Sequence, residues 1–116
     1  MDEPGGGTQD IYRSELGWGG FGPRSPVSEL NTASDDRQPN VRVNGREIVF
    51  ASNREGGEGE LDIWTATRSS VNEPWGPAVN LGPGVNSTAG ESRPSLSRNG
   101  KRLLFGAGGE IYVSKR

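Results

Sequence analysis

A β-hairpin is predicted by the stretch Gln38-Pro39-Asn40-Val41-Arg42-Val43-Asn44-Gly45-Arg46-Glu47-Ile48-Val49-Phe50. Asn44-Gly45 is the dipeptide that most readily takes φ > 0 at both central positions of a type I′ turn. Side chains of the strand that follows alternate between the two faces of a sheet. We therefore expect Ile48 and Phe50 on one face and Val49 on the other.

The same pattern recurs later in the chain, in Arg93-Pro94-Ser95-Leu96-Ser97-Arg98-Asn99-Gly100-Lys101-Arg102-Leu103-Leu104-Phe105. Its proline, its turn glycine and its final phenylalanine lie 55 positions after Pro39, Gly45 and Phe50. A strand that begins with an acidic residue, Ile and an aromatic residue occurs three times, at 10–12, 62–64 and 110–112. These recurrences predict a repeating unit of roughly 50 residues with four short strands.

The repeat divides the chain into strands three and four of a first unit (1–30), a complete unit (31–81) and strands one to three of a further unit (82–116). In the first part, residues 16–20 are predicted to form a loop and residues 27–30 the fourth strand. Units of this length favour an all-β, β-propeller fold over a solenoid. Propellers generally have four or more blades. The chain is therefore either a fragment of a larger propeller, which we favour, or a unit that self-associates into a ring.

Composition narrows the classes of function. Of 116 residues, 29% are hydrophobic, 19 are Gly and 8 are Pro, as expected for short strands and tight turns. The 13 basic and 15 acidic residues are interleaved, which argues against a nucleic-acid partner, and no apolar run is long enough for membrane insertion. His and Cys are absent, which removes the usual general base, metal ligands and thiol nucleophile. We therefore expect no enzyme activity, no metal site and no cofactor.

A family resemblance follows from these motifs. The pattern Pro-x-x-x-x-Asn-Gly-Arg/Lys-x-Ile/Leu-Val/Leu-Phe, followed by a Gly-rich turn and Asp-Ile-Tyr/Trp, resembles the TolB-type, WD-like β-propeller repeat. The family usually has Asp where Asn44 and Asn99 stand, and the Ser-x-Arg that follows Phe50 is missing after Phe105. The resemblance covers essentially the whole chain. It implies a bacterial, often periplasmic or secreted, binding scaffold and no particular ligand. The acidic, glycine-rich residues 1–7 do not resemble a signal peptide, so the sequence does not assign a cellular compartment.

Candidate binding residues lie on the connections into the first strands of the two later units: Asp36, Arg37, Glu91 and Arg93. The innermost strand of a propeller lines its channel, so residues at its start can reach a ligand at the channel mouth. Ion pairing between blades is the competing interpretation.

Among the aromatic residues, Trp18 has no aromatic counterpart in another unit and is the best candidate for an exposed ring. Trp64 and Trp75 have such counterparts and are expected in the core. The acidic turn at 55–60 matches no calcium-loop pattern, so we interpret it as a solvated turn.

We expect a non-catalytic module that binds a protein or peptide. One alternative is a glycan-binding or glycan-processing propeller fragment that uses Trp18. The other is a remnant of a longer protein with no function of its own.

Overall fold

The computed structural model describes residues 9–14, 16–17, 19–57, 60–88 and 90–116. These residues form antiparallel sheets of two, two, four and three strands, they contain no helix, and none of their sheets is closed. The predicted all-β class is therefore confirmed. The strands are β1 (Tyr12–Arg13), β2 (Leu16–Gly17), β3 (Gly20–Phe21), β4 (Ser25–Pro26), β5 (Asp36–Val41), β6 (Glu47–Ser52), β7 (Asp62–Thr67), β8 (Val79–Asn80), β9 (Glu91–Leu96), β10 (Arg102–Ala107) and β11 (Glu110–Lys115).

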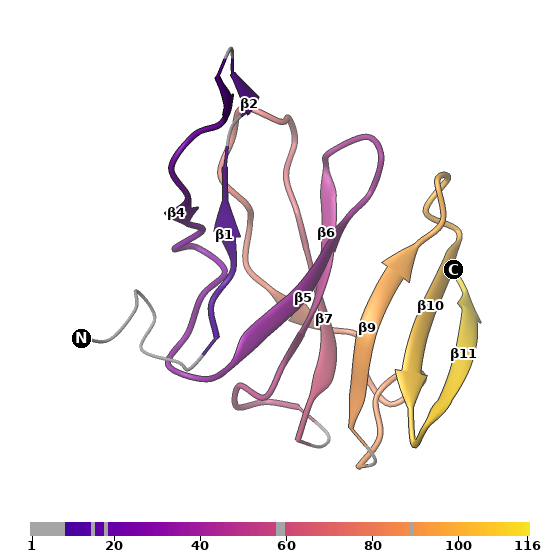
Figure 1. The fold of residues 1–116 in the computed structure, drawn as a ribbon. Helices are drawn as coiled ribbons and strands as arrows, with labels where there is room; N and C mark the ends of the chain where they lie inside the picture. Colours follow the sequence, from indigo (N-terminus) through magenta and orange to yellow (C-terminus); the bar gives the residue numbers. More distant parts are fainter. Residues whose placement is uncertain (1–8, 15, 18, 58–59, 89) are drawn as a thin grey trace.

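Three of the sheets follow one another across the molecule (Figure 1). The pair β1 and β4 lies on one side, the sheet β5-β6-β7-β8 in the middle and the sheet β9-β10-β11 on the other side. In both larger sheets the strands are neighbours in chain order, as successive hairpins require. The hairpins predicted at 38–50 and 93–105 are the pairs β5–β6 and β9–β10.

The two larger sheets have matching registers. Phe50 lies opposite Trp64 in one, and Phe105 lies opposite Tyr112 in the other. The first strand of each sheet has a β-bulge that contains a non-glycine residue at positive φ just before a proline: Gln38 (55°) and Arg93 (51°). We call two residues counterparts when they occupy the same place in the two registers.

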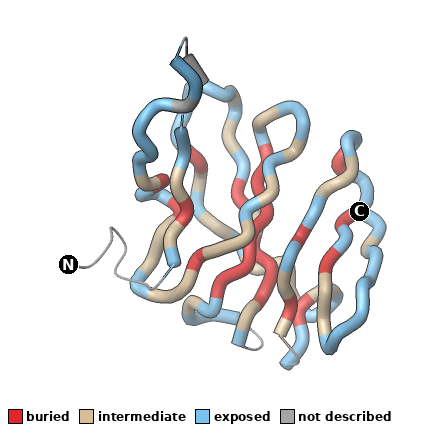
Figure 2. Tube along the Cα trace, in the orientation of Figure 1, coloured by how far each residue is buried: buried red, intermediate tan, exposed pale blue. Residues whose placement is uncertain are grey.

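Apolar side chains form two clusters, one on each face of the middle sheet. Ile48 and Phe50 belong to the cluster shared with the sheet of β1 and β4, together with Ile11, Val27, Leu30, Trp64, Ala66 and Trp75. Val49 belongs to the cluster shared with β10. The predicted alternation along β6 is therefore confirmed. Figure 2 shows the buried residues concentrated in the middle sheet, whereas β11 is largely exposed.

The predicted type I′ turn is wrong. Gly45 has a φ of 73°, but Asn44 is not at positive φ. The N–H of Gly45 donates to the carbonyl of Arg42 at 2.7 Å, which fits a type I turn followed by a glycine bulge. The Asn44 side chain accepts a hydrogen bond from the N–H of Arg46 at 2.9 Å, so this amide is satisfied without positive φ at Asn44.

Two further expectations about the first segment are wrong. The predicted loop at 16–20 contains β2 and the first residue of β3, and these two strands pair with each other. The predicted strand at 27–30 is mostly a turn, because the N–H groups of Leu30 and Asn31 both donate to the carbonyl of Val27, at 3.0 and 3.2 Å. The fourth strand, β4, ends before this turn and pairs with β1.

Candidate functional site

The outer face of the β9–β11 sheet carries exposed apolar side chains. Leu104 is 40% exposed, Ile111 80% and Val113 57%. Val49 and Ile63, the counterparts of Leu104 and Ile111, are fully buried in the middle sheet. Equivalent positions are therefore covered in one sheet and open in the next.

The face of the middle sheet that carries Val49 and Ile63 is covered by β10. Leu103 and Phe105 pack against Val49, Ala51 and Ile63. Successive side chains of a strand point to opposite faces, so Leu104 points away from this interface. We name the surface formed by Leu104, Ile111 and Val113, with Arg102 and Lys115 at its end, the open face. Exposed apolar groups gathered in this way, with a polar rim, are typical of interaction sites.

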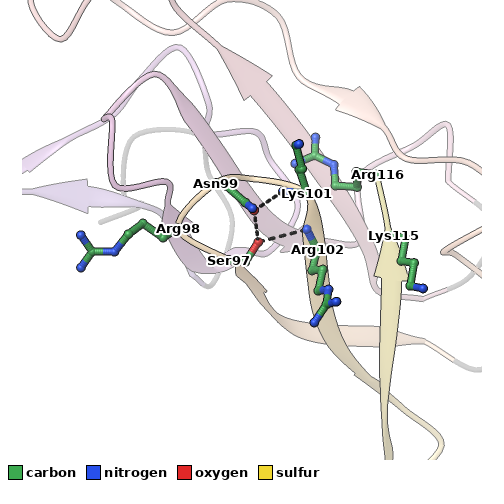
Figure 3. A pocket seen from close by; sticks show the side chains of 7 residues that line it. All are labelled: Ser97, Arg98, Asn99, Lys101, Arg102, Lys115 and Arg116. Atoms are coloured by element: carbon green, nitrogen blue, oxygen red, sulfur yellow. Dashed lines mark hydrogen bonds between the residues drawn. The ribbon is translucent and has the colours of Figure 1, made fainter.

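A basic hollow lies at the end of the open face (Figure 3). Its volume is about 720 Å³, and it is lined by Ser97, Arg98, Asn99, Lys101, Arg102, Lys115 and Arg116. Five of these residues are basic and none is acidic. Their counterparts in the middle sheet include three basic residues and one acidic residue, Glu47. In Figure 3 the side chains of Arg102 and Lys115 point the same way from neighbouring strands, whereas Arg98 points away from them.

Arg102 and Lys115 lie directly opposite each other on β10 and β11. Like charges in such cross-strand pairs destabilise a sheet. Their counterparts, Glu47 and Thr67, have no such repulsion. An anionic group bound beside Arg102 and Lys115 would relieve the repulsion.

Glu47 instead joins the two large sheets through an ion pair with Arg116. Both terminal nitrogens of Arg116 donate to the carboxylate, one of them at 3.2 Å, and the hydroxyl of Thr65 donates at 3.1 Å. Burial acts to raise the pKa of Glu47. The hydrogen bond and charge of Arg116, with smaller effects of Thr65 and Arg42, outweigh burial and hold the pKa below its ordinary value.

Polar side chains of β5 and of the turn after it hold the two sheets together along their first strands. Each bond joins a side chain to the backbone of β9 or of the turn that follows β9. The Gln38 side chain accepts from the N–H of Arg93 at 2.9 Å, that of Asn40 accepts from the N–H of Leu96 at 2.9 Å, and Arg42 donates to the carbonyl of Asn99 at 2.7 Å.

Two of the predicted binding residues, Asp36 and Glu91, are counterparts, and both are fully buried. Asp36 accepts hydrogen bonds from three residues: Thr32, Ser52 and Arg54. Glu91 accepts from the amide and the hydroxyl of Ser87 at 2.7 and 2.6 Å. Each carboxylate thus holds the connection that leads into its own sheet. A ligand role for these two residues stays a prediction.

The other predicted binding residues are more accessible. Arg37 is half-buried and Arg93 is exposed, at the starts of β5 and β9, where the bond between Gln38 and Arg93 joins the two strands. Trp18 lies outside the described residues.

The two remaining tryptophans are buried, as predicted for Trp64 and Trp75. Trp75 lines a second hollow of about 680 Å³ beside Tyr12 and Val41. The guanidinium of Arg68 lies 4.0 Å from the centre of its ring, so one face of the ring is already occupied.

Comparisons with known proteins give no family assignment. No protein-family model matches the chain, and no curated protein matches it at a significant level. Within the described part of the chain, no three His, Cys, Asp or Glu residues are placed to hold a metal ion. Over the same residues, no helix is long and apolar enough to cross a membrane.

Arg102, Lys115 and Arg116 were not predicted from the sequence as binding residues. A signal for Arg102 was present, since alignment of the two hairpin stretches places it against Glu47, a reversal of charge at one position. The ion pair between Glu47 and Arg116 joins residues far apart in sequence, and no local pattern could have revealed it.

Proposed function

We propose that the chain is a non-catalytic module of β-propeller blades that works as a scaffold for a protein or peptide partner. In this interpretation β5–β8 is a complete blade and β9–β11 are the first three strands of the next. The observation that carries the proposal is the contrast between Ile63, which is fully buried, and Ile111, which is 80% exposed at the equivalent position. The resemblance of the hairpin motifs to the TolB-type repeat supports the same interpretation.

The partner surface that fits the open face is another blade-like sheet. In the covered interface, Leu103 and Phe105 fill the apolar surface around Ile63. A partner that presents a similar pair can fill the surface around Ile111. Burial of one large apolar side chain contributes about 1.5–3 kcal/mol, so Leu104 and Ile111 together offer a substantial gain.

Catalysis and glycan binding have less support. Lys101 and Lys115 line an open hollow, not an enclosed pocket that would desolvate a catalytic base. The glycan-binding alternative depended on Trp18, and the described tryptophans are both buried.

A register-matched extension of the chain tests the proposal. Arg116 is the counterpart of Arg68, since their N–H groups donate to the carbonyls of Lys101 and Arg46, also counterparts. A second copy of residues 69–116 can therefore be joined after Arg116 to supply a fourth strand and a covering sheet. We expect at least tenfold slower hydrogen exchange at the amides of β11.

The control is Ile111→Asp, made in both lengths of the chain. It should lower the melting temperature of the extended chain and leave that of the original chain nearly unchanged, because Ile111 is exposed there. Unchanged exchange rates in β11 after extension would contradict the proposal.

A further inference from the structure

The charges at one end of the covered interface are reversed on the open face. At the covered interface, the acidic residue Glu47 at the start of β6 pairs with Arg116, which directly follows β11. On the open face, the counterpart of Glu47 is the basic residue Arg102. A covering sheet that brought a second arginine to this position would place two cations together.

We propose that the open face binds a blade whose residue at the Arg116 position is acidic, and that it disfavours association with a second, separately folded copy of this chain. This inference rests on the proposed function, because it names the class of partner that the scaffold takes. The partner is an acidic β-blade or an equivalent strand-forming protein segment.

Charge, not apolar packing, selects this partner. Apolar burial is non-directional, so Leu104, Ile111 and Val113 would accept any apolar surface of the right shape. Arg102 and Lys115 lie opposite each other, and no acidic residue lines the hollow around them. A carboxylate placed there would be attracted by both cations, whereas an arginine would be repelled by both.

Self-association is disfavoured for a second reason. The apolar pair that covers the middle sheet, Leu103 and Phe105, is only 1% and 7% exposed within each copy. A folded copy therefore has no such pair free to cover the open face of another. Its arginines at 68 and 116 would also bring the wrong charge.

A nucleic acid is a poorer fit than a protein segment. Lys115 lines the basic hollow, and Val113 and Ile111 lie on the same face of β11. An occupant of the whole surface therefore has to be apolar along one part and acidic at its end. Protein segments combine these two properties, whereas a nucleic-acid backbone is charged along its whole length.

Four versions of the extended chain test the charge rule. Residue 116 of the appended copy is either Arg or Glu, and residue 102 of the original part is either Arg or Glu, introduced by Arg116→Glu and Arg102→Glu. We expect the two combinations with opposite charges to melt about 3 °C or more above the two with like charges, in low salt. The difference should shrink in 1 M NaCl, because screening weakens both attraction and repulsion.

Hydrogen exchange in β11 separates the two levels of the proposal. Slow exchange in all four chains, with equal melting temperatures, would overturn the charge rule and leave the scaffold proposal intact. Fast exchange in all four chains would overturn both the charge rule and the scaffold proposal.

Titration of a fluorescent single-stranded oligonucleotide into the original chain tests nucleic acid as the alternative partner. Micromolar binding that is lost in Arg102→Glu would assign the hollow to nucleic acid and overturn the inference, whereas absence of binding supports it.

Discussion

Asn31 and Asn86 lie 55 positions apart and make the same two hydrogen bonds. Asn31 accepts from the N–H of Ile11 at 2.7 Å and donates to its carbonyl at 3.0 Å. Asn86 accepts from the N–H of Ile63 at 2.7 Å and donates to its carbonyl at 3.0 Å. Each asparagine thus ties one sheet to the connection that leads into the next. The same contact therefore recurs in the two connections, as the bulges recur in β5 and β9.

Replacement of Asn86 by Ala should lower the free energy of unfolding by about 1–3 kcal/mol, because the buried N–H of Ile63 loses its partner, whereas the carbonyl of Ile63 keeps the N–H of Leu81. Urea unfolding followed by tryptophan fluorescence measures the change. The matched control is Asn72→Ala, an exposed position, which should cost less than about 0.5 kcal/mol. Equal effects of the two substitutions would contradict a structural role for Asn86.

The buried carboxylate of Asp36 depends on Arg54, whose Nη2 lies 2.8 Å from it. Arg54→Met should cost about 3–5 kcal/mol, because it leaves a buried charge without its cation. The double variant Asp36→Asn with Arg54→Met removes that charge and should recover part of the loss. A double variant that is less stable than Arg54→Met would show that the charge is not the cause.

The ion pair between Glu47 and Arg116 predicts a pH dependence. The pKa of Glu47 is lowered in the folded chain, so its contribution is fully present above the unfolded pKa, near 4.5, and is lost as pH falls through the lower folded value. The melting temperature of the unaltered chain should therefore fall more steeply below about pH 4.5 than that of Arg116→Gln. Parallel profiles for the two chains would contradict this assignment.

Positive φ makes Gly45 hard to replace. Gly45 has a φ of 73°, and a Cβ there would lie 2.7 Å from Cγ1 of Val71. Gly45→Ala should cost about 1–2 kcal/mol from backbone strain alone. Gly84→Ala is the control, since a Cβ at Gly84 would meet nothing within 4 Å beyond its chain neighbours, and Gly84 is not at positive φ. Chemical denaturation measures the free energy of unfolding of both variants. An equal, small loss of stability in Gly45→Ala and Gly84→Ala would contradict the strain argument.

The two hairpins were predicted correctly, because they depend on the alternation of side chains and on the turn residues close by in the sequence. The prediction that Ile48 and Val49 lie on opposite faces was correct, because side chains alternate along β6. Ile48 packs in the cluster on the β1–β4 side of the middle sheet, and Val49 packs in the cluster on the β10 side. The predicted turn type was wrong because the Asn44 side chain accepts a hydrogen bond from the N–H of Arg46. The Asn-Gly dipeptide alone does not show whether this bond or a type I′ turn will form.

The candidate site was harder to predict. Asp36 and Glu91 lie 55 positions apart, at equivalent places of the two hairpin stretches, but nothing local in the sequence indicates that both are buried. The open face exists because β10 covers the middle sheet while the other face of β9–β11 is exposed. This depends on the tertiary packing of the sheets and could not be predicted from local sequence. Only the charge change from Glu47 to Arg102 could have been read from the sequence, by comparison of the chain with itself.

The mass of the original chain in solution, measured by light scattering after size-exclusion chromatography, tests most directly the claim that its open face takes a different, acidic blade. The account predicts a monomer of 12.4 kDa in low salt, because each copy has its covering pair buried and would bring arginine to Arg102. A discrete multimer that dissociates on Ile111→Asp would contradict it, since the open face would then be a contact between identical copies.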